Sequence, residues 1–111
     1  MIQYFPISAT SSGDNIIVTG SAYPNRRIAI LSYTVLTDTD VTIKWVSGAN
    51  GDISGEMPIA AKGGMSCTSN FMLAGGPIGL MRTIEAEDNI ILNLSGAANV
   101  GGFITCYVVT S

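Results

Sequence analysis

The sequence contains no histidine, and only 12% of its 111 residues are charged. Histidine is the commonest general base and a frequent metal ligand, so its absence excludes the Ser–His–Asp and Cys–His arrangements of nucleophilic catalysis. Two cysteines without histidine also make a poor set of zinc ligands. We therefore expect no catalytic residues, no metal site and no cofactor, and we predict that the protein is not an enzyme.

Positive charge is especially scarce, because five Lys and Arg residues face eight Asp and Glu residues and give a net charge of −3. The cations are scattered apart from the pair Arg26–Arg27. Nucleic-acid binding needs a basic stripe that displaces counterions, so no nucleic-acid partner is expected. A chain with so few ions has a surface that loses little hydration on contact, which favours burial in an assembly. The alternative is a monomer whose surface is rich in Ser, Thr and Asn.

Long apolar runs are missing too. No segment approaches the roughly 18 residues of a membrane span, so we expect no membrane partner. The N-terminus has no basic region followed by an apolar stretch, so it does not resemble a signal peptide and a cytoplasmic assembly site is expected. In a cytoplasm Cys67 and Cys106 are predicted to be free buried thiols, with a disulfide between them as the alternative.

The acidic residues form two small groups. Asp38 and Asp40 lie two apart in an expected turn, and Glu85, Glu87 and Asp88 cluster before an expected strand. Paired carboxylates serve glycoside hydrolysis and calcium binding. Aspartate is also typical of turns, where it accepts hydrogen bonds from backbone groups, and we favour that structural interpretation for both groups.

Apolar residues alternate with polar ones along much of the chain, which is typical of strands. In 41–47, Val41, Ile43 and Trp45 share one face, so Trp45 is expected in the core. Segments 27–36 and 103–109 are apolar on both faces, which requires a second covered face. Strands are expected over 2–7, 15–19, 27–36, 41–47, 65–69, 81–85, 89–95 and 103–109. About eight short strands in one domain, 1–111, indicate an antiparallel sandwich, barrel or jelly roll.

Candidate interface residues follow from the two-sided strands and from the N-terminus. Residues 1–12 are a candidate N-terminal arm, because aromatic and aliphatic side chains stand there beside a proline and a Ser/Thr run. The pair Arg26–Arg27 is a candidate clamp for an acidic partner, although an adjacent pair of cations at the start of a strand is more often simply solvated. The predicted interface comprises Tyr4, Phe5, Ile7, Arg26, Arg27, Tyr33, Phe103 and Tyr107.

Three segments carry a family resemblance. They read VTIKW followed by SG in 41–48, GEMPIAAKGG in 55–64, and LNLSGAANVGG in 92–102. Together they resemble a recurring pattern in small structural proteins of tailed bacteriophages, and the resemblance covers about residues 27–108. Such proteins are similar to head decoration, or cement, proteins. The resemblance implies an all-β, single-domain antiparallel β-sandwich of jelly-roll type.

The resemblance also implies a function. We expect a structural virion protein that binds the outer capsid surface and stabilises the shell by non-covalent contacts. Its expected partners are the major capsid protein and further copies of itself, as a homotrimer, on a virion assembled in the host cytoplasm. The alternative is a phage tail or fibre part, or a receptor- or carbohydrate-binding module of the same fold.

Overall fold

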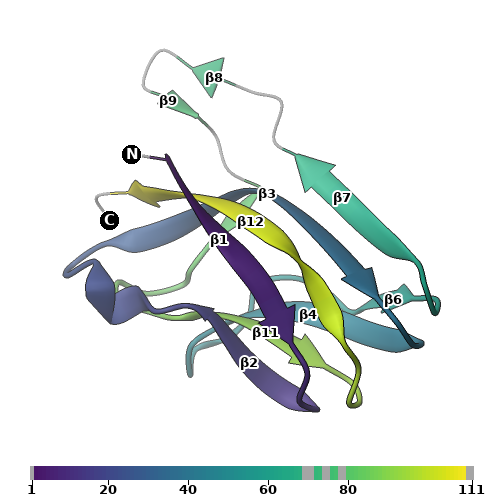
Figure 1. The fold of residues 1–111 in the computed structure, drawn as a ribbon. Coiled ribbons are helices and arrows are strands. Elements are labelled where there is room, and N and C mark those ends of the chain that lie inside the picture. The colour runs from purple at the N-terminus through teal and green to yellow at the C-terminus, as the bar shows by residue number, and fades with distance from the viewer. Residues whose placement is uncertain (1, 69–71, 74–75, 78–79, 110–111) are drawn as a thin grey trace.

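The computed structural model describes residues 2–68, 72–73, 76–77 and 80–109, and its strands form two stacked sheets with a small separate hairpin (Figure 1). Sheet A runs in the order β1 (Ile2–Ala9), β12 (Val100–Val109), β3 (Arg27–Thr37), with β7 (Gly64–Thr68) and β10 (Met81–Arg82) both paired to the other side of β3. Sheet B runs in the order β2 (Gly13–Val18), β11 (Ile90–Leu94), β4 (Val41–Ser47), with β5 (Gly51–Asp52) and β6 (Met57–Ile59) on the other side of β4. The separate hairpin joins β8 (Met72–Leu73) to β9 (Gly76–Pro77), and η1 (Gly20–Ala22) is a single 3-10 turn.

The order of the strands is that of a jelly roll. Every pairing in the two sheets is antiparallel. Four successive strand pairs, β1 with β2, β3 with β4, β6 with β7 and β11 with β12, each place one strand in either sheet. The chain therefore wraps around the core rather than completing one sheet before the other. This confirms the expected antiparallel sandwich of jelly-roll type.

The core follows from the period of two in the sequence. On β4 the side chains of Val41, Ile43 and Trp45 are buried, while Thr42 and Lys44 point to the other face and are partly exposed. Burial is complete for Trp45, whose ring packs edge-on against a second aromatic ring of sheet A with centroids 5.2 Å apart. The sandwich centre is filled from both sheets by aliphatic residues, among them Ile28, Ile30, Val35, Ile90, Leu92, Leu94 and Ile104.

The structure changes several expected boundaries. Residues 2–9, which lie within the candidate arm 1–12, form β1 and pair residue by residue with β12 from Ile2 opposite Tyr107 to Ala9 opposite Val100. This segment is therefore a strand of the sandwich and not an extended arm. β12 begins three residues before the expected start at residue 103, and β10 covers only part of the expected strand 81–85. The short strand β6 was not expected from the sequence. The expected strand 65–69 corresponds to β7, and Ser69 lies outside the described residues.

Candidate interaction face

The outer face of sheet A is built by strand alternation. On β1, alternate residues from Ile2 to Ser8 are exposed, while the intervening residues are progressively buried toward the core. The register carries this outer face across the sheet, since Pro6 lies opposite Phe103 and Phe103 lies opposite Thr34. The face continues onto β7, where Ser66 lies opposite Thr34 and the two hydroxyl groups are 2.9 Å apart.

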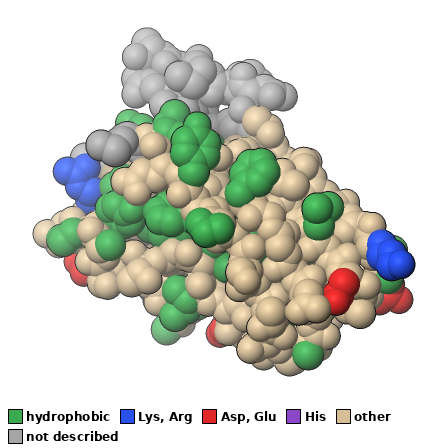
Figure 2. Space-filling view, in the orientation of Figure 1, with side chains coloured by type: hydrophobic (Ala, Val, Ile, Leu, Met, Phe, Trp, Pro, Cys, Tyr) green, Lys and Arg blue, Asp and Glu red, His purple; other side chains and the backbone are tan. Residues whose placement is uncertain are grey.

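Large apolar side chains are exposed on this face. Tyr4 is 75% exposed, Leu36 59%, Phe103 50% and Ile2 46%. Figure 2, drawn in the orientation of Figure 1, shows hydrophobic side chains gathered over the surface that β1 and β12 present, with charged side chains at its margins. We call the surface formed by Ile2, Tyr4, Pro6, Thr34, Leu36, Phe103, Thr105 and Tyr107 the outer face of sheet A. An exposed apolar patch of this kind on a small domain is typical of an interaction site.

Charge on the strands of sheet A is confined to Arg27 and Arg82. The two arginines lie at the same end of the sheet, because Arg82 pairs with Ala29 close to the start of β3. The Arg27 guanidinium donates a hydrogen bond from Nε to the carbonyl oxygen of Thr83 at 2.7 Å, which fixes it along the sheet margin. A partner that covers the rest of the face therefore desolvates no ion, and this keeps the cost of contact low.

Sheet B presents a different outer surface. Its strands place Asp14, Asn93 and Lys44 side by side across β2, β11 and β4. Asn93 donates to Asp14 at 2.7 Å, and Lys44 forms an ion pair with Asp52 on β5 at 3.2 Å. These hydrated groups are a poor surface for apolar contact, so the two faces of the sandwich differ in chemistry.

A glycine allows β12 to lie close to β3 beside the exposed Leu36. Gly102 has a φ of +146°, and a Cβ atom there would collide with the carbonyl oxygen of Thr34. Only glycine adopts this backbone conformation without strain. The VGG segment that contributes to the family resemblance thus has a local structural reason in this chain.

The predicted interface residues are divided between the surface and the core. Tyr4 and Phe103 are exposed on the outer face of sheet A, and Tyr107 is partly exposed there. Ile7 and Tyr33 are each only 3% exposed and belong to the core, so they are not available for contact.

The remaining three predicted residues lie beside the face or beneath it. Phe5 is partly buried and packs on the core. Arg26 is exposed in the turn before β3, and Arg27 lies at the sheet margin rather than as one half of a clamp. The sequence reasoning missed Ile2 and Leu36, although the alternation of β1 and the two-sided character of 27–36 were signals for both.

The carboxylates of Asp38 and Asp40 are engaged by turns. Asp38 accepts the backbone N–H of Asn99 at 2.9 Å and its side-chain Nδ2 at 2.7 Å, and these hydrogen bonds lower the pKa of the Asp38 carboxyl. Asp40 accepts the N–H of Ala61 at 2.7 Å. Asp38 thus ties the turn after β3 to the one before β12, which agrees with the structural interpretation of these aspartates.

Asp88 accepts hydrogen bonds from three residues. Ser47 Oγ donates to its Oδ2 at 2.8 Å, and Asn50 Nδ2 lies 2.9 Å from Oδ1 and 2.8 Å from Oδ2. The backbone N–H of Glu85 donates to Oδ2 at 3.1 Å. Ser47 in turn accepts the N–H of Ile84 at 2.8 Å. The cluster 85–88 therefore joins the segment before β11 to the end of β4.

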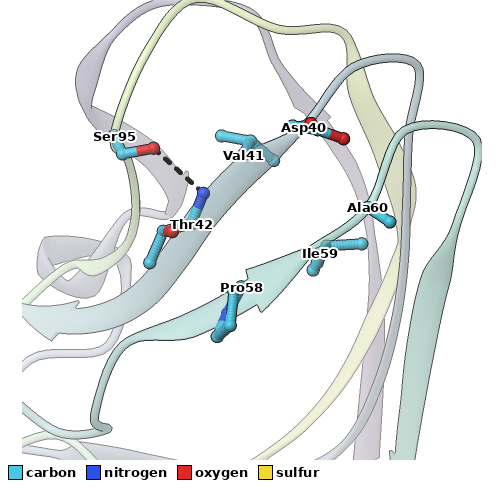
Figure 3. Close-up of a pocket in the computed structure, with 7 residues that line it drawn as sticks. All are labelled: Asp40, Val41, Thr42, Pro58, Ile59, Ala60 and Ser95. Carbon is cyan, nitrogen blue, oxygen red and sulfur yellow. Dashed lines mark hydrogen bonds between the residues drawn. The ribbon is translucent and has the colours of Figure 1, made fainter.

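An open hollow of about 620 Å³ lies beside β4 and β6 (Figure 3). Two of its polar side chains are already engaged, because Ser95 Oγ accepts the N–H of Thr42 at 2.9 Å and Asp40 is bonded as described. The other lining residues are Val41, Pro58, Ile59 and Ala60. This hollow presents no activated nucleophile and no pair of free acids.

Both cysteines are free thiols. Cys106 on β12 and Cys67 on β7 flank opposite sides of β3, so about two strand spacings, roughly 9.6 Å, separate them. A disulfide needs Cα atoms within roughly 7 Å, which excludes the alternative pairing. Burial raises the pKa of Cys106 to about 12. Burial also raises the pKa of Tyr33 to about 12, with a further contribution from the neighbouring Cys67.

Neither a cluster of metal-ligating side chains nor a membrane-spanning helix is found among the described residues. No three His, Cys, Asp or Glu side chains there come together in a way that suits a metal ion. No helix among them has the length and apolar character to cross a bilayer.

Comparison with known proteins supports the fold. No family model and no curated protein matches this sequence. A solved chain from Bacillus endospore appendages, described as a novel family of disulfide-linked pili, matches with a TM-score of 0.53 and 19% identity. The match covers 96% of this chain and 83% of the other. At this identity the similarity shows a shared β-rich fold, and we conclude that the chain is an antiparallel jelly-roll sandwich.

Proposed function

We propose that this protein is a structural subunit of a multi-copy assembly, and specifically a capsid decoration subunit that binds the outer surface of a virion shell. The outer face of sheet A carries this proposal. It combines exposed apolar side chains, a near absence of charge and a rigid backing of paired strands. The carboxylates of Asp38, Asp40 and Asp88, by contrast, hold turns together.

The proposed mechanism is non-covalent clamping. Phe103 is half exposed, so a partner that covers it removes on the order of 100 Å² of aromatic surface from water, worth about 2 kcal/mol. Tyr4 is more exposed and combines a large ring with a hydroxyl group, a combination enriched at binding hot spots. A standard interface buries about 800 Å² on each partner, and repetition over many copies makes the shell slow to open.

Binding to shells tests this proposal. Capsid shells that lack the protein are incubated with it and sedimented, and the bound fraction is measured. We expect hundreds of copies per shell, and we expect Phe103→Thr to weaken binding by about 10- to 100-fold. Ile16→Thr is the matched control, because Ile16 is 60% exposed on the charged outer surface of sheet B. Equal losses for both variants, or no binding to shells, would refute the role of this face.

A second candidate is a subunit of a filament or tail fibre, which the fold shared with the pilus chain favours. Covalent linkage like that of the disulfide-linked pili is not supported here, because Cys106 is 1% exposed and Cys67 packs against the core. Electron microscopy of the native particle separates the candidates. A subunit spread over a shell supports decoration, and a row of copies along a fibre or a few copies at a tail supports the second candidate.

A further inference from the structure

Sheet A ends in two unpaired strand edges. In the part of the chain that the structure describes, β1 pairs only with β12 and β7 pairs only with β3, so they lie at opposite edges of the same sheet. Among the described residues, the backbone groups of 2–9 and 64–68 form no hydrogen bonds outside these two ladders. Each edge thus presents a row of N–H and C=O groups available to another strand.

These edges lack most of the features that keep strands from adding to one another. Neither β1, IQYFPISA, nor β7, GMSCT, contains a charged residue. β1 pairs with β12 over eight residues with no bulge, and Pro6 is the one residue of β1 that has no backbone N–H to donate. Sheet B differs, because β2 carries Asp14 and β5 carries Asp52. Charge, the commonest protection of an edge strand, is therefore present on β2 and β5 of sheet B and missing from β1 and β7 of sheet A.

Strand direction shows which occupant fits. β1 and β3 are each antiparallel to β12, so they are parallel to each other, and β7 is antiparallel to β3. β7 and β1 therefore run in opposite directions within one copy. A second copy placed beside the first in the same orientation brings its β1 next to the free edge of β7 as an antiparallel neighbour. This is the only pairing type in sheet A, and antiparallel pairs are slightly more stable than parallel ones.

The faces of the two strands also correspond. Met65 and Cys67 on β7 and Phe5 on β1 point inward and pack against the core. Ser66 on β7 and Tyr4 on β1 point to the outer face. A joined sheet would therefore keep its apolar inner side and its neutral outer side across the junction. No one-residue shift of register, which would exchange the inward and outward side chains of a strand, is needed.

We propose that copies of this chain associate edge to edge, with β7 of one copy pairing antiparallel to β1 of the next. The contact uses the strand edges and not the outer face of sheet A, so it stands apart from the proposed capsid contact. Because the two edges differ, the contact is heterologous and either closes into a ring, such as the expected trimer, or extends into a filament.

Mixing two singly blocked variants of the purified protein tests this proposal without any capsid. Tyr4→Lys places a charge on the β1 edge strand, and Ser66→Lys places one on the β7 edge strand. Sedimentation velocity should show assemblies larger than one 11.5 kDa chain for the wild type and a monomer for each variant alone. An equimolar mixture should form a dimer and stop there, because one open β7 then meets one open β1.

Phe103→Lys is the matched control, since it places the same charge on the same face but on the inner strand β12. It should leave the assembly intact, and its loss of assembly would instead indicate face-to-face contact. A monomeric wild type at millimolar concentration would overturn the proposal. So would dissociation by Tyr4→Lys with no effect of Ser66→Lys, because that result indicates two-fold pairing of β1 with β1.

A measurement on the wild type covers the case in which a variant fails to fold. Amide hydrogen exchange is followed at low and high protein concentration. Protection should rise with concentration in both β1 and β7 and stay constant in β2. A rise confined to one of the two strands, or no rise at all, contradicts the proposal. Capsid binding plays no part in either test, so failure here leaves the decoration proposal standing, and the reverse also holds.

Discussion

Replacing Asp88 with alanine separates a structural role of the acidic cluster 85–88 from a role in ligand binding. The change removes the acceptor for Ser47, Asn50 and the N–H of Glu85. Ser47 is fully buried, so the loss of its acceptor carries most of the cost, about 1–3 kcal/mol for an unpaired buried polar group. The bonds to Asn50 and Glu85 are exposed and add about 1 kcal/mol together. We expect a total loss of about 3 kcal/mol.

Thermal and urea unfolding measure this loss. For a domain of this size about 1 kcal/mol corresponds to about 4 °C, so the Tm of Asp88→Ala should fall by about 12 °C. Asp88→Asn keeps a carbonyl acceptor and should lose less. Glu85→Gln is the control, because the Glu85 side chain is exposed and forms no hydrogen bond with the described residues, and it should change stability by less than about 0.5 kcal/mol.

The opposite pattern would refute the structural interpretation. A ligand site predicts that Asp88→Ala and Glu85→Gln leave stability nearly unchanged, and that calcium raises the Tm of the wild type and not of the variants. A structural cluster predicts a large loss for Asp88→Ala and no effect of calcium. Calcium titration of the wild type and both variants in the same unfolding assay therefore decides between the two.

Three further predictions concern stability and reactivity. Gly102→Ala should destabilise the fold by about 2 kcal/mol or more in urea unfolding, because a Cβ meets the Thr34 carbonyl at a positive φ; a neutral result would contradict the close approach of β12 to β3. Thiol labelling at pH 8 should modify Cys106 about two to three orders of magnitude more slowly than an unfolded thiol, because burial raises its pKa from the ordinary 9.0 to about 12, while Cys67 reacts faster; equal rates would contradict the burial of Cys106. Folding lowers the pKa of Asp38, so the contribution of its carboxylate to stability is present above the ordinary pKa of 3.8 and is lost as the pH falls through the lower folded pKa. The difference in the free energy of unfolding between the wild type and Asp38→Asn should therefore shrink over that pH range. A constant difference would contradict the hydrogen bonds assigned to Asp38.

The architecture was predictable because sandwich strands alternate. The pattern of 41–47 placed Val41, Ile43 and Trp45 inward, and all three are buried. Short elements escaped prediction for a physical reason. β6 is three residues long and contains Pro58, so it has too few positions to show a period and one residue that disfavours strands.

The interaction face was only partly predictable. Two-sided strands reveal that a second apolar face exists, but their sequence does not say which side faces the core. Phe103 and Ile104 look alike in the sequence, yet Phe103 is 50% exposed and Ile104 is fully buried. The pairing of β12 with β3 and β1 determines which of its sides faces the core, and this pairing joins segments that lie far apart in the sequence.

The separation of charge between the two sheets connects the face with the edges. Sheet B places Asp14, Lys44 and Asp52 where they meet water, and Asp14 and Asp52 lie on its outer strands β2 and β5. Sheet A confines its charge to Arg27 and Arg82 at one end and leaves both its outer face and its β1 and β7 edges neutral. Exposed apolar surface and open edges both favour aggregation in a free monomer. A chain that leaves both features on one sheet, and protects the other sheet, is suited to having sheet A covered in its working state, with the face against a partner and the edges against neighbouring copies.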